Sequence, residues 1–108
     1  MKSKHTINIA QDFSKVPIGR YLNDSDSNGT LFRDSVLIPA LKKHHLIEIN
    51  LDDTEGYGSS FLEESFGGLV RVHKISSADL LSRISFISLE DPSLVEEIES
   101  YIKDAAIK

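Results

Sequence analysis

The chain has 108 residues, of which 40% are apolar and 27% charged, and its formal net charge is −5. These values describe one globular domain over residues 1–108 with a single buried core. The absence of cysteine excludes disulfides, thiolate zinc sites and cysteine nucleophiles. No apolar run reaches the roughly 18 residues that span a bilayer, and the N-terminal residues lack the apolar stretch of a signal peptide. We therefore expect a cytoplasmic protein without membrane contact.

The charge is distributed unevenly along the sequence. Residues 1–44 carry seven Lys/Arg and four Asp/Glu, a balance of +3, whereas residues 45–108 carry five and thirteen, a balance of −8. The acidic total argues against a nucleic-acid partner, because such binding requires clustered basic side chains. If the two halves lay on different faces, the molecule would be a dipole able to steer a charged protein partner. The alternative is a solvated acidic surface that keeps the protein soluble.

The first elements are a strand, a polar loop and a helix. Thr6–Ala10 alternates apolar and polar residues, which predicts a half-buried strand. Asn23–Gly29 is the most polar stretch of the chain and predicts a loop. Thr30 is expected to cap a helix over residues 31–43. Pro39 lies inside this helix and should kink or weaken it.

The middle of the chain reads as a strand, a turn and a second helix. His45–Leu51 carries a mostly alternating apolar run and predicts the central strand of the sheet. After the turn-forming residues 52–58, a helical pattern starts at Ser60, which has capping-box spacing to Glu63. Glycine inside a helix costs about 1 kcal/mol relative to alanine. We therefore expect the pair Gly67–Gly68 to allow close approach of the helix to the sheet.

The last third predicts a short helix, a strand and a long helix. Ser77 is expected to cap a helix that runs to Leu81, and residues 84–89 alternate as a strand. Asp91 as N-cap and Pro92 at the first helical position start the last helix, whose apolar stripe contains Leu94, Ile98, Ile102 and Ala105. The alternation of strands and helices predicts an α/β sandwich with a mixed or parallel sheet.

Residues 47–68 carry a resemblance to a known family. The strand, the acidic glycine-bearing turn and the helix that opens on two serines resemble the signature of sulfate-transporter and anti-sigma-factor-antagonist (STAS) domains. The segment from Gly56 to Leu69, the opening Ile7–Ser14 and the Gly19–Tyr21 loop before residues 32–41 look like the bacterial STAS-like domain family of unknown function. The resemblance implies a small STAS-like sandwich, with a mixed sheet of about four strands flanked by helices. In this fold a further strand would fall at Val70–Ile75.

The resemblance also implies a regulatory function without catalysis. In phosphoregulated antagonists the first serine of the motif accepts phosphate from a GHKL-type ATPase kinase, and the added charge dissociates the complex. By position the acceptor is Ser59, and a helix N-terminus suits a phosphate. The sequence departs from the antagonists at Gly58, where they carry aspartate, and at Phe61, where they carry glycine. The alternative is that Ser60 is a helix cap and Ser59 a polar turn residue.

We therefore expect a partner-binding face around Tyr57, Gly58, Ser59 and Ser60, on a monomer or weak homodimer. The resemblance implies that the partner is a protein, namely a GHKL-type ATPase or kinase. Arg20 could contact a carboxylate or phosphate of that partner, or form a local salt bridge with Asp24 or Asp26. Glu63 is a second candidate contact, and with Glu64 it would repel a new phosphate. The alternative function is a constitutive scaffold, or a domain that senses a nucleotide or another anion without phosphorylation.

Metal binding and catalysis have weaker signals. Asp24–Gly29 matches the first half of an EF-hand loop, but the twelfth position is Ser35 rather than glutamate, so an ordinary loop is the favoured interpretation. The pair His44–His45 has no third ligand at a suitable spacing. An enzyme would depend on the acidic cluster Asp52, Asp53 and Glu55 alone. We expect no cofactor, no metal and no enzymatic activity.

Overall fold

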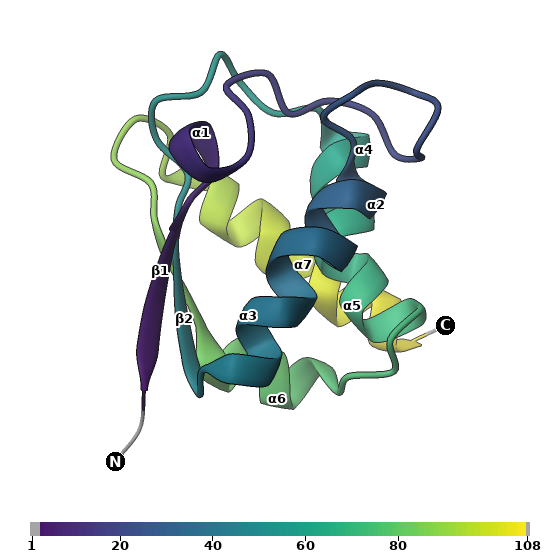
Figure 1. Cartoon of the computed structure of the whole chain (residues 1–108). Helices are drawn as coiled ribbons and strands as arrows, with labels where there is room; N and C mark the ends of the chain where they lie inside the picture. The colour runs from purple at the N-terminus through teal and green to yellow at the C-terminus, as the bar shows by residue number, and fades with distance from the viewer. Residues whose placement is uncertain (1–2, 108) are drawn as a thin grey trace.

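The computed structural model describes residues 3–107 and contains a three-stranded parallel sheet (Figure 1). The strands β1 (Lys4–Asn8), β2 (Leu46–Asn50) and β3 (Ile84–Ile87) lie in the order β1-β2-β3. The prediction that β2 is central is confirmed, whereas the mixed sheet of about four strands is wrong for the described residues. The stretch Val70–Ile75 forms the end of a helix and a turn, because the helix continues to Arg71.

Within residues 3–107, five helices accompany the sheet, and two of them contain a π-helical segment. Their bounds are α1 (Ile9–Asp12), the continuous run α2 (Gly29–Phe32), η1 (Arg33–Leu37) and α3 (Ile38–Lys43), the continuous run α4 (Ser59–Leu62), η2 (Glu63–Gly67) and α5 (Gly68–Arg71), α6 (Ser77–Arg83) and α7 (Ser93–Ile107). Among the helices of residues 3–107, none has the length and apolarity that crossing a bilayer requires.

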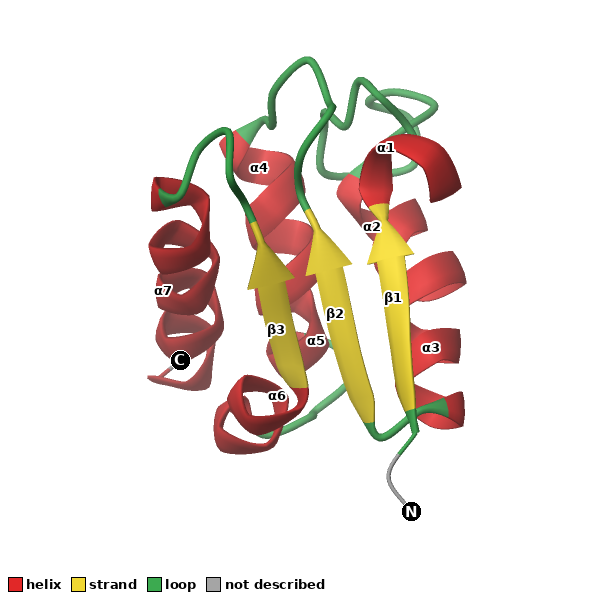
Figure 2. Cartoon of the chain, turned by 90° about the vertical axis from the view of Figure 1, so that its left-hand side faces the viewer, coloured by secondary structure: helices red, strands yellow, loops and turns green. Residues whose placement is uncertain are grey.

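The helices cover one face of the sheet. Figure 2 shows the three strands in front of the helix layer, with the opposite face uncovered. Successive right-handed crossovers that always step in the same direction place every connecting helix on the same side. The strand register aligns Ile7, Ile49 and Phe86 on the covered face, and Thr6 beside Glu48 on the open face. The apolar core therefore lies between the sheet and the helices.

The ends of several elements differ from the predicted ends because side chains intervene. β1 stops at Asn8, whose Oδ1 accepts the backbone N–H of Gln11 and begins α1. The N-cap of α2 is Asn28 rather than Thr30, and the Thr30 hydroxyl instead donates to the carbonyl of Arg20. Ser76, not Ser77, caps α6. The two corrected caps move a helix start by one or two residues, and the strand β1 ends two residues earlier than predicted.

Pro39 has the predicted disruptive effect on its helix. A proline has no backbone N–H and crowds the preceding turn of a helix. The turn before Pro39 is the π-helical segment η1, in which the Ile38 N–H donates to the carbonyl of Arg33. The wider turn lets the chain pass the proline without ending the helix, so α3 continues to Lys43.

Replacement of Asn28 by alanine is expected to destabilise the fold by about 1–2 kcal/mol, at the upper end of the range for a helix cap. Asn28 is buried, its Oδ1 accepts the Leu31 N–H at 2.8 Å, and its Nδ2 donates to the Ser25 carbonyl at 3.0 Å. Asn28→Asp keeps the acceptor and should lose less. Urea unfolding of both variants measures the difference, and equal losses would contradict the capping role.

The carboxyl ends of all three strands point to the same edge of the sheet, which we call the loop edge. The segments 13–28, 51–58 and 88–92 meet there, as Figure 2 shows above the strand tips. The Glu55 N–H donates to the Lys15 carbonyl at 2.8 Å, and Asp52 accepts the N–H groups of Leu89 and Glu90. Ligands of parallel α/β sheets bind at this edge.

Candidate functional site

The turn before α4 presents two serines at the loop edge. Gly58 is the N-cap, with an extended φ of −72°, and Ser59 and Ser60 are the first two helical residues. Both serines are exposed, and no side chain caps this helix. The predicted capping box of Ser60 and Glu63 is therefore wrong. Since the first N–H groups of a helix have no intrahelical partner, donors are available beside both hydroxyls.

The serine turn lies against the segment 16–22. The Gly58 N–H donates to the carbonyl of Pro17 at 3.4 Å. A Cβ atom on Gly58 would lie 3.4 Å from Cγ1 of Ile18, which is ordinary contact. The side chain of Ile18 thus borders the turn that carries Ser59, and a larger residue at Gly58 would touch this segment.

The hydroxyl group of Tyr57 points into the protein rather than into solvent. The hydroxyl donates to the Leu51 carbonyl at 2.8 Å, and the ring lies 6.2 Å from that of Phe61. Burial raises the pKa of Tyr57 to about 12. The residue connects the turn to the end of β2, so it positions Ser59 from inside the loop.

Arg20 and Glu63, the two predicted partner contacts, contact each other. The Arg20 guanidinium pairs with Glu63 and with Glu64, the latter at 3.0 Å. Asp24 accepts the backbone N–H of Arg20 at 3.0 Å, but not its guanidinium. Burial opposes the ionisation of Glu63, but hydrogen bonds from Arg71 and Arg20 outweigh it and hold the pKa of Glu63 below its ordinary value. Both residues therefore fasten the loop to the helix.

Glu64 is the centre of an ion cluster, in which Glu64 and Arg33 are buried and the other members are partly exposed. It receives Arg33 Nη1 at 2.6 Å, Arg20 Nη1 at 3.0 Å and Arg71 Nη2 at 3.2 Å. The side chains of Arg33 and Glu64 are 5% and 6% exposed. Hydrogen bonds to carboxylates raise the pKa of Arg33 above its ordinary value in spite of its burial. With Glu63 and Asp34 the cluster has three positive and three negative groups, so Glu63 and Glu64 are neutralised rather than free to repel a phosphate at Ser59.

The glycine pair accommodates this cluster and α7 instead of the sheet. A Cβ atom on Gly68 would lie 2.5 Å from Arg33 Nη1. On Gly67 it would lie 2.6 Å from a Glu63 carboxylate oxygen and 3.4 Å from the Tyr101 carbonyl of α7. The predicted approach to the sheet is wrong, because the glycines give room to charged side chains between the helices.

The acidic loops use their side chains in internal hydrogen bonds. Asp52 accepts two backbone N–H groups of the 88–92 loop, at 3.1 and 3.0 Å. Asp53 has a backbone φ of 73°, and its backbone N–H donates to the carboxylate of Glu90. In the Asp24–Gly29 loop, Asp24 and Asn28 accept backbone N–H groups. Within residues 3–107, no group of three acidic or histidine side chains is arranged to hold a metal ion.

Charge separates along the strand direction rather than between the two sequence halves. The three segments of the loop edge, residues 13–28, 51–58 and 88–92, contain seven Asp/Glu and two Lys/Arg. At the other end, Lys4 begins β1, Lys42 and Lys43 end α3, and Arg83 ends α6. The molecule therefore has an acidic loop edge and a basic opposite end.

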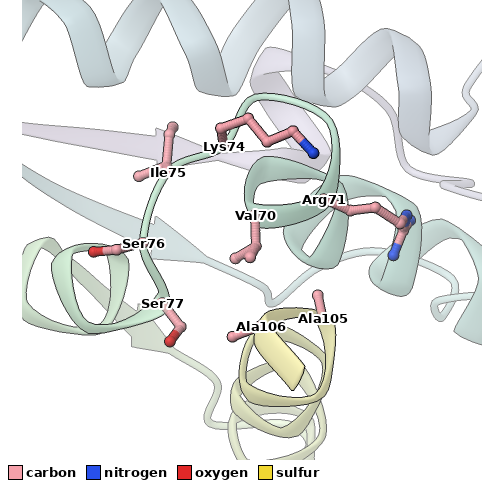
Figure 3. A pocket seen from close by; sticks show the side chains of 8 residues that line it. All are labelled: Val70, Arg71, Lys74, Ile75, Ser76, Ser77, Ala105 and Ala106. Carbon is pink, nitrogen blue, oxygen red and sulfur yellow. The ribbon is translucent and has the colours of Figure 1, made fainter. Parts of the chain in front are cut away.

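A pocket of about 430 Å³ lies at a distance from the serine turn, between α5, α6 and α7 (Figure 3). Val70 and Ser77 line it together with the end of α7. Arg71 is at its border, but its guanidinium pairs with Glu63 and Glu64. This pocket and the serine turn are separate features.

Sequence reasoning missed the pair of Arg33 and Glu64. The two residues are 31 positions apart, and each is followed or preceded by an acidic residue, so the local sequence resembles an ordinary charged helix surface. The local signal was a charged residue at a position that helical spacing assigns to the buried side. In the first of the two helices, Arg33 lies on the same face as Gly29 and Leu37. Both π-helical segments begin with members of this cluster, and π-helical turns are frequent at functional sites.

Comparison with known sequences identifies the family. No curated protein and no solved structure matches the chain. A family model with the description "STAS-like domain of unknown function (DUF4325)" matches residues 28–94, which include the serine turn, β2, β3 and the pair of Arg33 and Glu64. Since this match covers more than half of the chain, the protein belongs to that family of STAS-like domains.

Proposed function

We propose that the protein is a regulatory interaction module without catalytic activity, and that phosphorylation of Ser59 controls its binding to a protein partner. The observation that carries the proposal is the exposed Ser59 at the start of α4, on the loop edge of a STAS-like domain. Neither serine of the turn is needed as a helix cap, because Gly58 occupies that position. Resemblance to phosphoregulated antagonists supports a GHKL-type ATPase or kinase as partner.

The surroundings of Ser59 explain how a phosphate would release the partner. Ile18 borders the turn, so a partner that covers this edge brings apolar groups close to Ser59. Docking of the partner would remove water from a phosphate dianion at this position. The free-energy cost of that dehydration exceeds the stabilisation that a contact at the exposed rim of the interface contributes. In the free protein the same phosphate is stabilised by the unpaired N–H groups of the first helical turn.

Two substitutions test the switch. Ser59→Ala should fold normally, bind the partner as the unphosphorylated protein does and resist modification. Ser59→Glu should weaken binding, though less than phosphate, because a carboxylate carries one charge instead of nearly two. Ser60→Ala is the matched control, since Ser60 is also exposed and follows Ser59 directly. Calorimetric titration with the partner kinase gives the affinities, and wild-type binding by both Ser59 variants would contradict the switch.

The modification itself is tested on protein isolated from its native host. Trypsin releases the peptide between Lys43 and Arg71, which contains both serines of the turn. Mass spectrometry of this peptide should find phosphate on Ser59. Its absence under several growth conditions would instead support a constitutive scaffold that uses the same edge. Thermal-shift titration with nucleotides separates that scaffold from a domain that senses a nucleotide, because a specific ligand raises the melting temperature with its concentration.

The departure at Gly58 offers a gain-of-function test. Gly58 has an extended φ that every residue adopts, and a Cβ atom there meets only ordinary contact with Ile18. Gly58→Asp, which restores the aspartate of the antagonists, should therefore fold. Faster phosphorylation of this variant by the partner kinase would support recognition of the serine turn, and Gly58→Asn controls for side-chain size.

A further inference from the structure

We infer that the segment 16–22 and the acidic residues around it form a docking surface for a cationic segment of a partner protein that also carries large apolar side chains. This inference deepens the proposed function by giving the chemistry of the partner, and it rests on the assignment of the loop edge as the interaction face. It does not depend on phosphorylation.

The first argument is the concentration of exposed apolar side chains. Among the residues whose burial the structure describes, 3–106, six large apolar residues are strongly exposed, and four of them lie within these seven positions: Val16 at 49%, Ile18 at 52%, Tyr21 at 57% and Leu22 at 66%. Single exposed apolar side chains are normal on a protein surface, whereas contiguous ones mark interaction sites. Tyrosine in particular is enriched where protein interfaces bind strongly.

The second argument is that the protein holds this segment in place. The Gly29 N–H donates to the Gly19 carbonyl at 2.9 Å, and the Ser25 hydroxyl donates to the Ile18 carbonyl at 2.6 Å. Asp24 accepts the Tyr21 N–H at 2.8 Å, and the Arg20 guanidinium reaches Glu63 and Glu64. The apolar side chains are thus exposed on a fixed backbone, so this segment loses little conformational entropy when a partner binds.

The third argument is the sign of the surrounding charge. Asp24 and Asp26 lie in the same loop as the segment. Glu55 lies next to the beginning of that loop, because its backbone N–H donates to the Lys15 carbonyl. Hydrogen bonds from the backbone of Tyr21 and Arg20 lower the pKa of Asp24, which keeps it ionised. Of the two cationic residues of this edge, Arg20 is already neutralised by Glu63 and Glu64. An apolar centre with an acidic rim fits apolar anchors flanked by Lys or Arg.

A second copy of the chain fits this surface less well. Each copy has a net charge of −5, and two loop edges would face each other with like charge. The partner therefore differs from the protein in charge.

The test uses the whole unphosphorylated chain and a short synthetic peptide of lysine and leucine as probe. Backbone amide NMR shifts on titration should change in the segments 16–26 and 53–60. Fluorescence anisotropy with labelled peptide gives the affinity. Leu22→Ser and Tyr21→Ser should each weaken binding by about tenfold, as truncation of a central interface residue does. Leu89→Ser is the matched control, because Leu89 is 83% exposed on the same acidic edge but outside the segment.

Three outcomes of the peptide titration would overturn the inference. They are equal binding of a glutamate–leucine peptide, unchanged affinity of both variants, and shifts confined to other parts of the chain. Concentration-dependent dimers in sedimentation that Leu22→Ser abolishes would assign the surface to a second copy and also contradict it. If the peptide binds as expected but Ser59→Glu leaves partner binding unchanged, the phosphorylation switch fails and the docking surface stands.

Discussion

Glu64→Gln is expected to destabilise the protein by about 3–5 kcal/mol, the cost of removing one partner of a buried ion pair. The carboxylate that remains beside Arg33 is Asp34, whose side chain is 47% exposed. Arg33 has a side chain that is 5% exposed and loses its 2.6 Å contact with the carboxylate in this variant. Arg20 and Arg71 lose one of their two partners as well. The amide keeps the volume of the carboxylate, so the loss measures charge rather than packing. Urea unfolding monitored by circular dichroism gives the free energy.

Glu63→Gln is the matched control for this prediction. Glu63 is the preceding residue and also accepts Arg20 and Arg71, but its side chain is 23% exposed. Water can replace part of the lost interaction, so the destabilisation should be about 1 kcal/mol or less, as for exposed ion pairs. Arg33→Met combined with Glu64→Gln should recover much of the lost stability, since no buried charge then lacks a partner. Equal losses for Glu63→Gln and Glu64→Gln would contradict the central position of Glu64.

Phe61→Ala is expected to destabilise the protein by about 3–5 kcal/mol, as large-to-small changes of buried aromatic residues do. Phe61 is fully buried, and its ring centre lies 5.6 Å from that of Phe32, 6.1 Å from Phe13 and 6.2 Å from Tyr57. These rings come from three separate segments at the loop edge. Its loss leaves a cavity beneath the serine turn, and chemical unfolding measures the effect.

Phe61→Leu separates packing from the aromatic contacts. Leucine fills most of the space, so we expect a loss well below that of alanine. The departure from the glycine of the antagonists then has a structural explanation, because this chain fills the position beside Phe32 with a core residue. A loss below about 1 kcal/mol for Phe61→Ala would show that the aromatic cluster is not a structural unit of the loop edge.

The ion cluster and the aromatic cluster together explain why the loop edge is ordered. Arg20 joins the 13–28 loop to η2, and Phe13 joins its beginning to Phe61 of α4. The serine turn therefore sits between two anchors, one charged and one apolar. Glu64→Gln weakens the charged anchor, because Arg20 then keeps only Glu63, and it should increase the mobility of segment 16–22. The stability of the cluster is thereby coupled to the proposed docking surface.

The sequence by itself determined the elements whose signal is local. The alternation in residues 45–51 identified the central strand β2, and the apolar repeat after Asp91 identified α7 with Ile98 and Ile102 buried. The family signature around Ser59 was also local, since strand, turn and serines are consecutive. Periodicity and turn chemistry act over a few residues, so a single sequence contains this information.

Only the tertiary structure decided the number of strands, the helix caps and the partners of the charged side chains. Residues 70–75 were the stretch left for the further strand that the resemblance implies, although they are short and continuous with the preceding helix. In the structure that helix runs to Arg71, so no strand forms there. Arg20 was placed with nearby aspartates because they are close in sequence, whereas its partners are 43 and 44 residues away. Arg33 and Glu64 bury their charges because they contact each other and because Asp34, Arg20 and Arg71 complete the ion cluster. These contacts form only after the two π-helical segments have packed together.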